Sequence, residues 1–311
     1  MRKPMNFDFV GHRKLFFSIA LALIVVGIVA NLILGTQLDI EFKGGTMVSY
    51  TFSEGIDKND AATTVKEAIG QDVSVEISED RASGKQKLVV NLASQTELSP
   101  EDQDSITKAL QDKYTDSELT FLEANSVNPT MGQEFFAKCL TAIALAGVFL
   151  IIYIGIRFRK VGGISAGLMA IVALLFDILI AYFVFVIFRI PVNNNFIAVA
   201  LTLFGYALND AVVIYDRIRE NRRLMGPKVP IGEVVNKSMN QCFARSLNTS
   251  ITTFVAIGTV AVVALFNGLD EIVSFALPMM IGIAAAFCST QGLANPLWVT
   301  WQEHKAKKRC V

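Results

Sequence analysis

A single charged side chain, Asp210, interrupts an apolar stretch from Phe196 to Tyr215 that is otherwise long enough to cross a lipid bilayer. The hydrocarbon core of a bilayer is about 30 Å thick, so about 20 apolar residues of helix span it. A carboxyl group at that depth is costly and commonly marks an ion or proton pathway. The stretch therefore predicts a membrane-spanning helix, and ion or proton coupling through Asp210 is the leading hypothesis.

Other apolar stretches predict a polytopic, mainly α-helical membrane protein, since 52% of the residues are hydrophobic. Six spans are expected in a 1+5 arrangement, with one span before a polar insert at 36–133 and a five-helix bundle at 134–299 after it. The expected spans are residues 15–35, 135–156, 162–187, 196–215, 246–265 and 272–299.

The charges indicate how these spans are oriented. Basic residues gather in the N-terminal segment 1–14, after the second and fourth spans, and in the C-terminal tail 300–311. The insert holds 18 Asp and Glu against 8 Lys and Arg. The positive-inside rule then places both termini in the cytoplasm and the insert outside it. A cleaved signal peptide is the alternative for the first span, but no small-x-small cleavage site follows its long apolar run.

The insert has the pattern of a small domain that folds in water. Its alternating and helical periods predict the order β-α-β-β-α-β, which is that of a ferredoxin-like α+β fold. Ser99 is the expected N-cap of the second helix, with Pro100 at its first position and acidic residues in its first turn. The insert has no catalytic spacing, so binding is its expected role.

Several kinds of chemistry are disfavoured by the sequence. None of the four cysteines lies in the insert, and the two histidines, His12 and His304, lie near the chain ends. No His/Cys/Glu cluster has metal-ligand spacing, so no metal or other cofactor is expected. The chain has no GxxxxGK[ST] phosphate loop, no nucleophile elbow and no nucleic-acid motif. We expect neither enzymatic activity nor nucleic-acid binding.

Two motifs carry a resemblance to a known family. They are LDIEFKGGT at Leu38–Thr46, directly after the first span, and GYALNDAVVIYDRIREN at Gly205–Asn221, across the end of the fourth. Both resemble the SecF subunits of the bacterial protein-export machinery, within the SecD/SecF family of the resistance-nodulation-division superfamily. The layout of one span, an external domain and five further spans is also similar, so the resemblance covers almost the whole chain.

The resemblance implies a function and partners. Members of this family act with SecD, here expected as a separate chain, and use the proton-motive force to assist late stages of polypeptide export through the SecYEG channel. The implied partners are SecD, SecYEG, the exported unfolded polypeptide and the lipid bilayer. The implied location is the bacterial inner or plasma membrane. Two alternatives stay open, a passive scaffold that stabilises the translocon and a half-size proton-coupled efflux transporter.

Three charged residues are the candidates for proton coupling. Burial disfavours the charged form of a carboxyl group, which supports Asp210 as a switchable charge. The resemblance places Arg245 opposite Asp210, where a guanidinium stabilises a carboxylate; the alternative is an ordinary positive-inside anchor. Asp177 follows Phe176, where similar proteins often have a histidine. It is either a second proton stop or a hydrogen-bonded helix-pairing residue.

Further residues are candidates for supporting roles. Thr202, Tyr206 and Asn209 are possible polar neighbours of the proton route. Phe42, Lys43, Gly44 and Gly45 form a motif in which the glycines are expected to permit a sharp exit from the first span, and the resemblance leaves a hinge role open. Asp216, Arg217, Arg219, Glu220 and Asn221 are expected to anchor the cytoplasmic end of the fourth span, and the resemblance implies that they organise the next loop. Within that loop, Ile231 to Cys242 is expected to form an interfacial helix.

Overall fold

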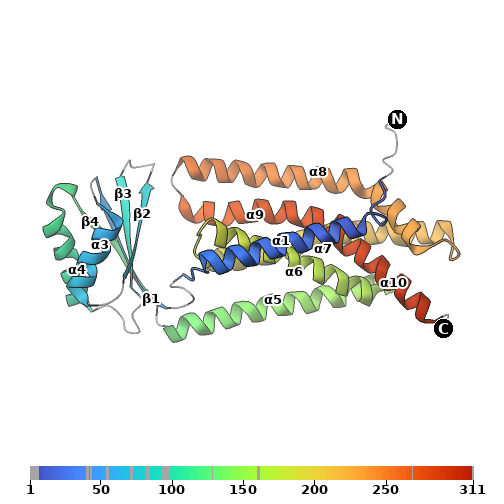
Figure 1. The fold of residues 1–311 in the computed structure, drawn as a ribbon, viewed down its shortest axis with the longest axis horizontal. Coiled ribbons are helices and arrows are strands. Elements are labelled where there is room, and N and C mark those ends of the chain that lie inside the picture. The colour runs from blue at the N-terminus through green and yellow to red at the C-terminus, as the bar shows by residue number, and fades with distance from the viewer. Residues whose placement is uncertain are drawn as a thin grey trace.

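The structure is a computed structural model of the 311-residue chain. It describes residues 7–39, 42, 44–53, 56–70, 73–80, 85–92, 99–127, 129–159, 162–267 and 269–309. Figure 1 shows a bundle of long helices with a small sheet domain at one end, and both ends of the chain lie at the other end of the bundle.

The bundle contains six helical segments that are long and apolar enough to cross a membrane, within the described residues. Because they are hydrophobic on most sides, they suit a lipid environment. Their bounds are Arg13–Leu34 for α1, Pro129–Arg157 for α5, Gly163–Ile187 for α6, Asn194–Met225 for α7, Ile231–Phe266 for α8, and Asp270–Arg309 for α9, η3 and α10 together.

Two helices continue beyond the spans expected from hydropathy. Helix α7 runs to Met225, ten residues past the apolar stretch, and α8 begins at Ile231. The expected interfacial helix at Ile231 to Cys242 is therefore the first part of α8 and not a separate element. Val234, Val235 and Met239 in this part are buried in the main core cluster, so tertiary packing extends the helix where hydropathy alone ends it.

The last apolar segment is not one regular α-helix, although residues 272–299 were expected to form a single span. Helix α9, Asp270–Ser289, passes into a five-residue π-helix, Thr290–Ala294, and then into α10, Asn295–Arg309. The Asn295 side-chain amide donates to the Thr290 carbonyl at 2.7 Å. Such π-segments are rare and often lie at functional sites.

The insert forms a four-stranded antiparallel sheet with two long helices. The strands are Gly45–Phe52 (β1), Val73–Asp80 (β2), Lys85–Leu92 (β3) and Thr120–Val127 (β4), and the helices are Lys58–Ile69 (α3) and Pro100–Lys113 (α4). A short 3-10 turn, η1, covers Thr115–Ser117. The element order is the predicted one. The strands lie in the order β2-β3-β1-β4.

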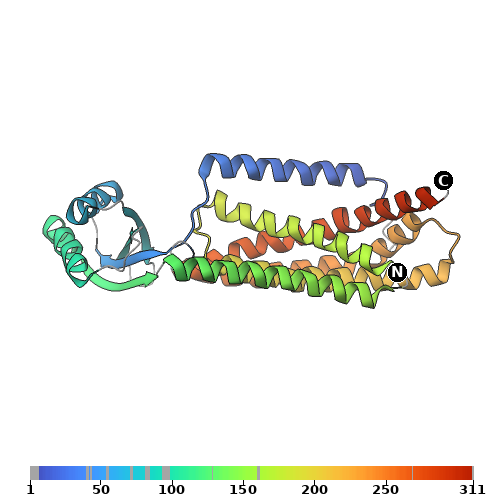
Figure 2. The same ribbon diagram turned by 90° about the horizontal axis from the view of Figure 1, so that it is seen from below.

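Both helices cover one face of this sheet, the face directed away from the bundle in Figures 1 and 2. Their apolar residues form a core with the sheet, and Val65 of α3 and Ile106 of α4 are fully buried in it. The predicted cap of α4 is confirmed, since the Ser99 hydroxyl accepts from the Asp102 backbone N–H at 3.1 Å and Pro100 opens the helix. The local sequence therefore predicts correctly where α4 begins.

The segment between α1 and β1 is tied to the bundle. Leu38 forms a parallel bridge with Val192 in the loop between α6 and α7, and Phe42 is buried against Phe185, Val192 and Ile197. Gly44 and Gly45 have φ angles of 75° and 135°, which favour glycine. The glycines therefore turn the chain into the sheet while Phe42 anchors the preceding residues. Lys43, the fourth residue of this motif, lies outside the described residues.

Helices α5 and α6 approach each other closely at Gly163. A Cβ atom placed there would lie 2.5 Å from the carbonyl oxygen of Gly155 and 3.0 Å from that of Ile154. Backbone atoms cannot move aside as a flexible side chain can, so only glycine fits without moving the two helices apart. Close approach through small residues is a common basis of helix packing in membranes.

We predict that Gly163→Ala destabilises the bundle by about 1–3 kcal/mol, because the added methyl group overpacks the α5–α6 contact. Gly205→Ala on α7 is the matched control, since no atom lies within 4 Å of its added Cβ. Thermal unfolding of the detergent-solubilised chain measures both. Equal unfolding temperatures for the two variants would contradict the close approach of α5 and α6.

Candidate functional site

Asp210 lies on α7 at its contact with α8. The Ser246 hydroxyl donates a hydrogen bond to one carboxyl oxygen, Oδ1, and the second oxygen, Oδ2, is buried without a hydrogen-bond partner among the described residues. In apolar surroundings, a charged carboxylate needs more hydrogen-bond or ion-pair partners than a neutral carboxyl group does. One neutral donor and one vacant oxygen suit a group that gains and loses a proton better than a permanently paired carboxylate.

A second contact lies one helical turn from the first. The Tyr206 hydroxyl lies 2.5 Å from the Ser250 hydroxyl, which in turn donates to the Ser246 carbonyl at 2.9 Å. Ser246 and Ser250 are both buried and are four residues apart, so they share one face of α8. The two serines therefore join α7 to α8 along a polar line within an apolar interface.

A small cavity of about 10 Å³ adjoins Asp210. This volume is close to the minimum that holds one water molecule. Its lining includes polar groups from both helices: Tyr206, Asn209, Arg245, Ser246 and Thr249. Polar walls and this volume make the cavity suitable for a water that reaches the Asp210 carboxyl group.

Arg245 lies at the same cavity, so α7 and α8 bring it to the side of Asp210. Its positive charge is close enough to act on the carboxyl group, but the two side chains form no ion pair in the described structure. Arg245 is also exposed, so we do not expect a strong, desolvated ion pair between Arg245 and Asp210. The arrangement is a carboxyl group held by serine with an arginine nearby.

The three residues expected to be polar neighbours of this site divide into two groups. Tyr206 and Asn209 line the cavity with Asp210. Thr202 is exposed, does not line the cavity, and donates its hydroxyl to the Ala198 carbonyl of its own helix at 2.7 Å. The structure therefore does not bring Thr202 to the site.

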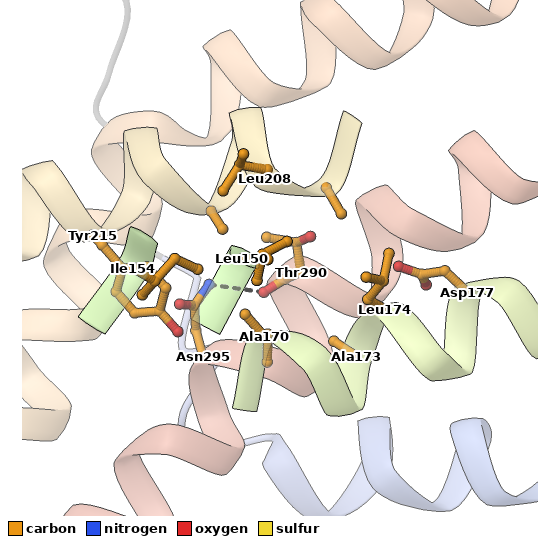
Figure 3. A pocket seen from close by; sticks show the side chains of 13 residues that line it. Leu150, Ile154, Ala170, Ala173, Leu174, Asp177, Leu208, Tyr215, Thr290 and Asn295 are labelled. Carbon is orange, nitrogen blue, oxygen red and sulfur yellow. Dashed lines mark hydrogen bonds between the residues drawn. The ribbon is translucent and has the colours of Figure 1, made fainter. Parts of the chain in front are cut away.

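Asp177 occupies a different environment, shown in Figure 3. It lies on α6, only 1% exposed, and neither carboxyl oxygen has a hydrogen-bond partner among the described residues. Ser289 lies beside it, but its hydroxyl is directed to the Ala286 carbonyl at 3.1 Å. Helix pairing, one of the two roles predicted for Asp177, requires a hydrogen bond from its carboxyl group to another helix, and neither carboxyl oxygen makes one to a described residue.

Asp177 and Asp210 face opposite sides of α7. The cavity beside Asp177 also has a volume of about 10 Å³ and is lined by Ala207, Leu208 and Ala211 of α7, together with Thr290 and Asn295 from the π-helix region. The cavity beside Asp210 is lined by Tyr206, Asn209, Asp210 and Val213 of α7. The two carboxyl groups, expected as members of one proton-coupling set, are thus separated by the body of a helix.

The segment Asp216–Asn221, with the sequence DRIREN, lies on the extension of α7 and connects three helices. Asp216 pairs with Arg157 of α5 at 3.1 Å and with Arg219 at 3.0 Å. Arg217 pairs with Glu220 at 2.6 Å, and its Nε donates to Gln241 of α8 at 2.6 Å. These contacts favour an organising role for the segment.

Asn221 is the buried member of this segment. Its side-chain amide donates to Ser238 and to Gln241 of α8, both at 2.8 Å. A buried amide with two donors in use fixes the relative position of the two helices. This contact extends the α7–α8 interface from Asp210 to the ends of both helices.

Three polar groups of the bundle were not singled out from the sequence. Ser246 and Ser250 follow Arg245 within FARSLNTS, and their spacing of four residues is a signal for one helix face. Gln291 of the π-helix is 3% exposed, and both polar atoms of its side-chain amide are without partners in the described structure. No feature of the sequence predicts the π-helix at Thr290–Ala294. Within the described residues, no cluster of metal-ligating side chains is present.

Comparison with known proteins identifies relatives over nearly the whole chain. The family described as "Protein export membrane protein SecD/SecF, C-terminal" matches residues 106–304. The protein translocase subunit SecF of Petrotoga mobilis is 30% identical over 305 residues, which cover 97% of this chain and 98% of that protein. SecF of Alicyclobacillus acidocaldarius is also 30% identical, over 98% of this chain and 96% of its own length.

Longer relatives contain a similar segment. SecDF of Bacillus subtilis is 29% identical over 97% of this chain, which spans 39% of that protein. The crystal structure of SecDF from Thermus thermophilus, titled a translocon-associated membrane protein, superposes with a TM-score of 0.78 at 25% identity, covering 97% of this chain and 40% of that chain. This multi-pass membrane protein therefore belongs to the SecD/SecF family of protein export membrane proteins, as a chain similar to the SecF subunits.

Proposed function

We propose that this chain works with a separate SecD chain and uses the proton-motive force to assist polypeptide export through SecYEG. Its membership of a protein-export family supports the export role, and the fused SecDF relatives support SecD as the partner. The observation that carries proton coupling is the Asp210 carboxyl group, with one oxygen bonded to Ser246 and the other unpartnered. No covalent chemistry by the chain itself is part of this proposal.

The proposed orientation follows from the charges at the two ends of the bundle. The end away from the sheet carries the arginines of α5 and the α7 extension and the lysines of α10, which the positive-inside rule places in the cytoplasm. The acidic sheet domain then lies outside the cytoplasm. We assign it the ferredoxin-like class, because its two crossover helices and strand order fit a split βαβ unit.

The proposed coupling step is a change in the α7–α8 contact. When Asp210 is charged, the Ser246 hydroxyl and the nearby Arg245 stabilise it. When Oδ2 takes a proton, the carboxyl group becomes neutral, and its attraction for Arg245 and for the serine donor weakens. One charge moved through 100 mV is worth about 2.3 kcal/mol, which is enough to shift an equilibrium between two bundle conformations.

We predict that Asp210→Asn removes the gradient-dependent part of export, because an amide keeps a polar side chain of similar size but cannot exchange a proton. The measurement is export of a reporter protein into vesicles that contain the chain, its cognate SecD and SecYEG, with and without a proton gradient. Thr202→Val is the matched control, since it changes a polar residue of the same helix that lies away from the cavity.

The result also separates proton coupling from the two alternatives. A scaffold has no need for Asp210 to titrate, so an intact gradient-dependent increment in Asp210→Asn at matched abundance would favour that role and overturn proton coupling. A half-size efflux transporter predicts gradient-driven efflux of a small molecule by the chain without SecYEG. We expect no such efflux.

We assign Asp177 a second proton-binding role, because its buried carboxyl group lacks the hydrogen bond that a helix-pairing role requires. We predict that Asp177→Leu stabilises the bundle by about 1–3 kcal/mol, since it removes an unsatisfied polar group, and lowers the gradient-dependent export. Thermal unfolding and the vesicle assay measure the two effects. A lower unfolding temperature with unchanged export would instead indicate a structural role in helix pairing.

A further inference from the structure

An arginine-rich pocket lies between α5 and α7 at the end of the bundle away from the sheet. It is open, with a volume of about 1000 Å³. One acidic side chain, Glu220, lines it together with the apolar Ile156. Its arginines are Arg157, Arg159, Arg219, Arg222 and Arg223. The pocket lies outside the cavities beside Asp210 and Asp177, and the coupling proposal does not use it.

The acidic groups near this pocket are already engaged. Asp216 is shared by Arg157 and Arg219, at 3.1 and 3.0 Å, and Glu220 is paired with Arg217 at 2.6 Å. One carboxylate therefore serves two arginines of the pocket, and the other serves an arginine outside its lining. The pocket keeps a clear excess of positive charge.

Two pocket arginines are uncommitted in the described structure. The guanidinium groups of Arg159 and Arg223 form no hydrogen bond or ion pair with any described residue. Arg222 is held in place, since its guanidinium donates to the Val229 carbonyl at 2.5 Å and to the Pro227 carbonyl at 3.1 Å. The pocket thus combines one fixed guanidinium with two free ones, an arrangement that fits the several oxygens of a phosphate group.

Apolar side chains border the pocket on the side of the membrane spans. Ile156 in its lining is 68% exposed, and Ile152 one turn earlier on α5 is 50% exposed. A free phosphate ion or a polar protein loop would make no favourable contact with these apolar side chains. A phospholipid can contact both the arginines and the apolar side chains, because its headgroup is charged and its acyl chains are apolar.

We propose that this pocket binds the phosphate headgroup of an anionic phospholipid, with Arg159 and Arg223 as its main contacts and the acyl chains along the exposed apolar face of α5. The pocket is at the end of two membrane-spanning helices, where the headgroups of a bilayer lie. Basic pockets between such helices are known lipid headgroup sites in membrane proteins. Bound lipid would hold α5 and the α7 extension together.

The test uses the full chain, purified in detergent and depleted of lipid, and measures lipid binding by native mass spectrometry. Phosphatidylglycerol is the anionic probe, phosphatidylcholine the zwitterionic one, and inorganic phosphate a soluble competitor. The test variant is Arg159→Gln/Arg223→Gln. The matched control is Lys228→Gln/Lys237→Gln, which removes two exposed positive charges from outside the pocket at the same end of the bundle.

We expect the native chain to prefer phosphatidylglycerol to phosphatidylcholine, and the arginine variant to bind phosphatidylglycerol about tenfold more weakly. The lysine control keeps the native affinity, and millimolar inorganic phosphate does not displace the lipid. Should the double variant fail to fold, judged by its unfolding temperature, the single variants Arg159→Gln and Arg223→Gln carry the test, each with a smaller loss of affinity.

Four results would overturn the proposal. Equal weakening in the lysine control would show diffuse attraction between charges, and equal binding of the two lipids would show no recognition of the headgroup charge. Complete displacement by inorganic phosphate would indicate a soluble anion as the ligand. Unchanged phosphatidylglycerol affinity in the arginine variants would exclude the lipid site and point to an acidic protein surface as the occupant.

Discussion

The hydrogen bond from Ser246 to Asp210 is the interaction on which the polar part of the bundle depends. A carboxyl group among apolar helices must be partnered or neutral, because water does not solvate it there. Here a single neutral donor partners one oxygen, and the charge of Arg245 lies near but outside an ion pair. The carboxyl group therefore has one serine partner and no ion pair among the described residues.

The bond between Ser246 and Asp210 is one of several polar contacts along the interface of α7 and α8. On the side of the sheet domain, the two helices share the contact of Tyr206 with Ser250. Towards the end of α7 at Met225, they share the contacts of Asn221 with Ser238 and Gln241. The opposite face of α7 packs towards Asp177 and the π-helix region. Helix α7 therefore contacts α8 through one face and the surroundings of Asp177 through the other.

The two ends of the bundle serve different connections. At one end, Phe42 and the bridge between Leu38 and Val192 hold the sheet domain to the loop between α6 and α7. At the other end, the ion pairs of Asp216 connect α5 to the extension of α7, next to the arginine-rich pocket. Helix α7 begins at the first connection and ends at the second, so it links the sheet domain and the charged end.

The sequence by itself determined the approximate positions of the six helices, the element order of the sheet domain, the Ser99 cap of α4, and the placement of Asp210 within a span. These follow from hydropathy, periodicity and capping residues, which act over a few neighbouring residues. Only the tertiary structure decided that Ser246 partners Asp210, that Asp177 faces the other side of α7, and that Thr202 lies apart. Those outcomes depend on which helix packs against each face, and a single helix in an apolar solvent carries no such information because most of its sides are hydrophobic.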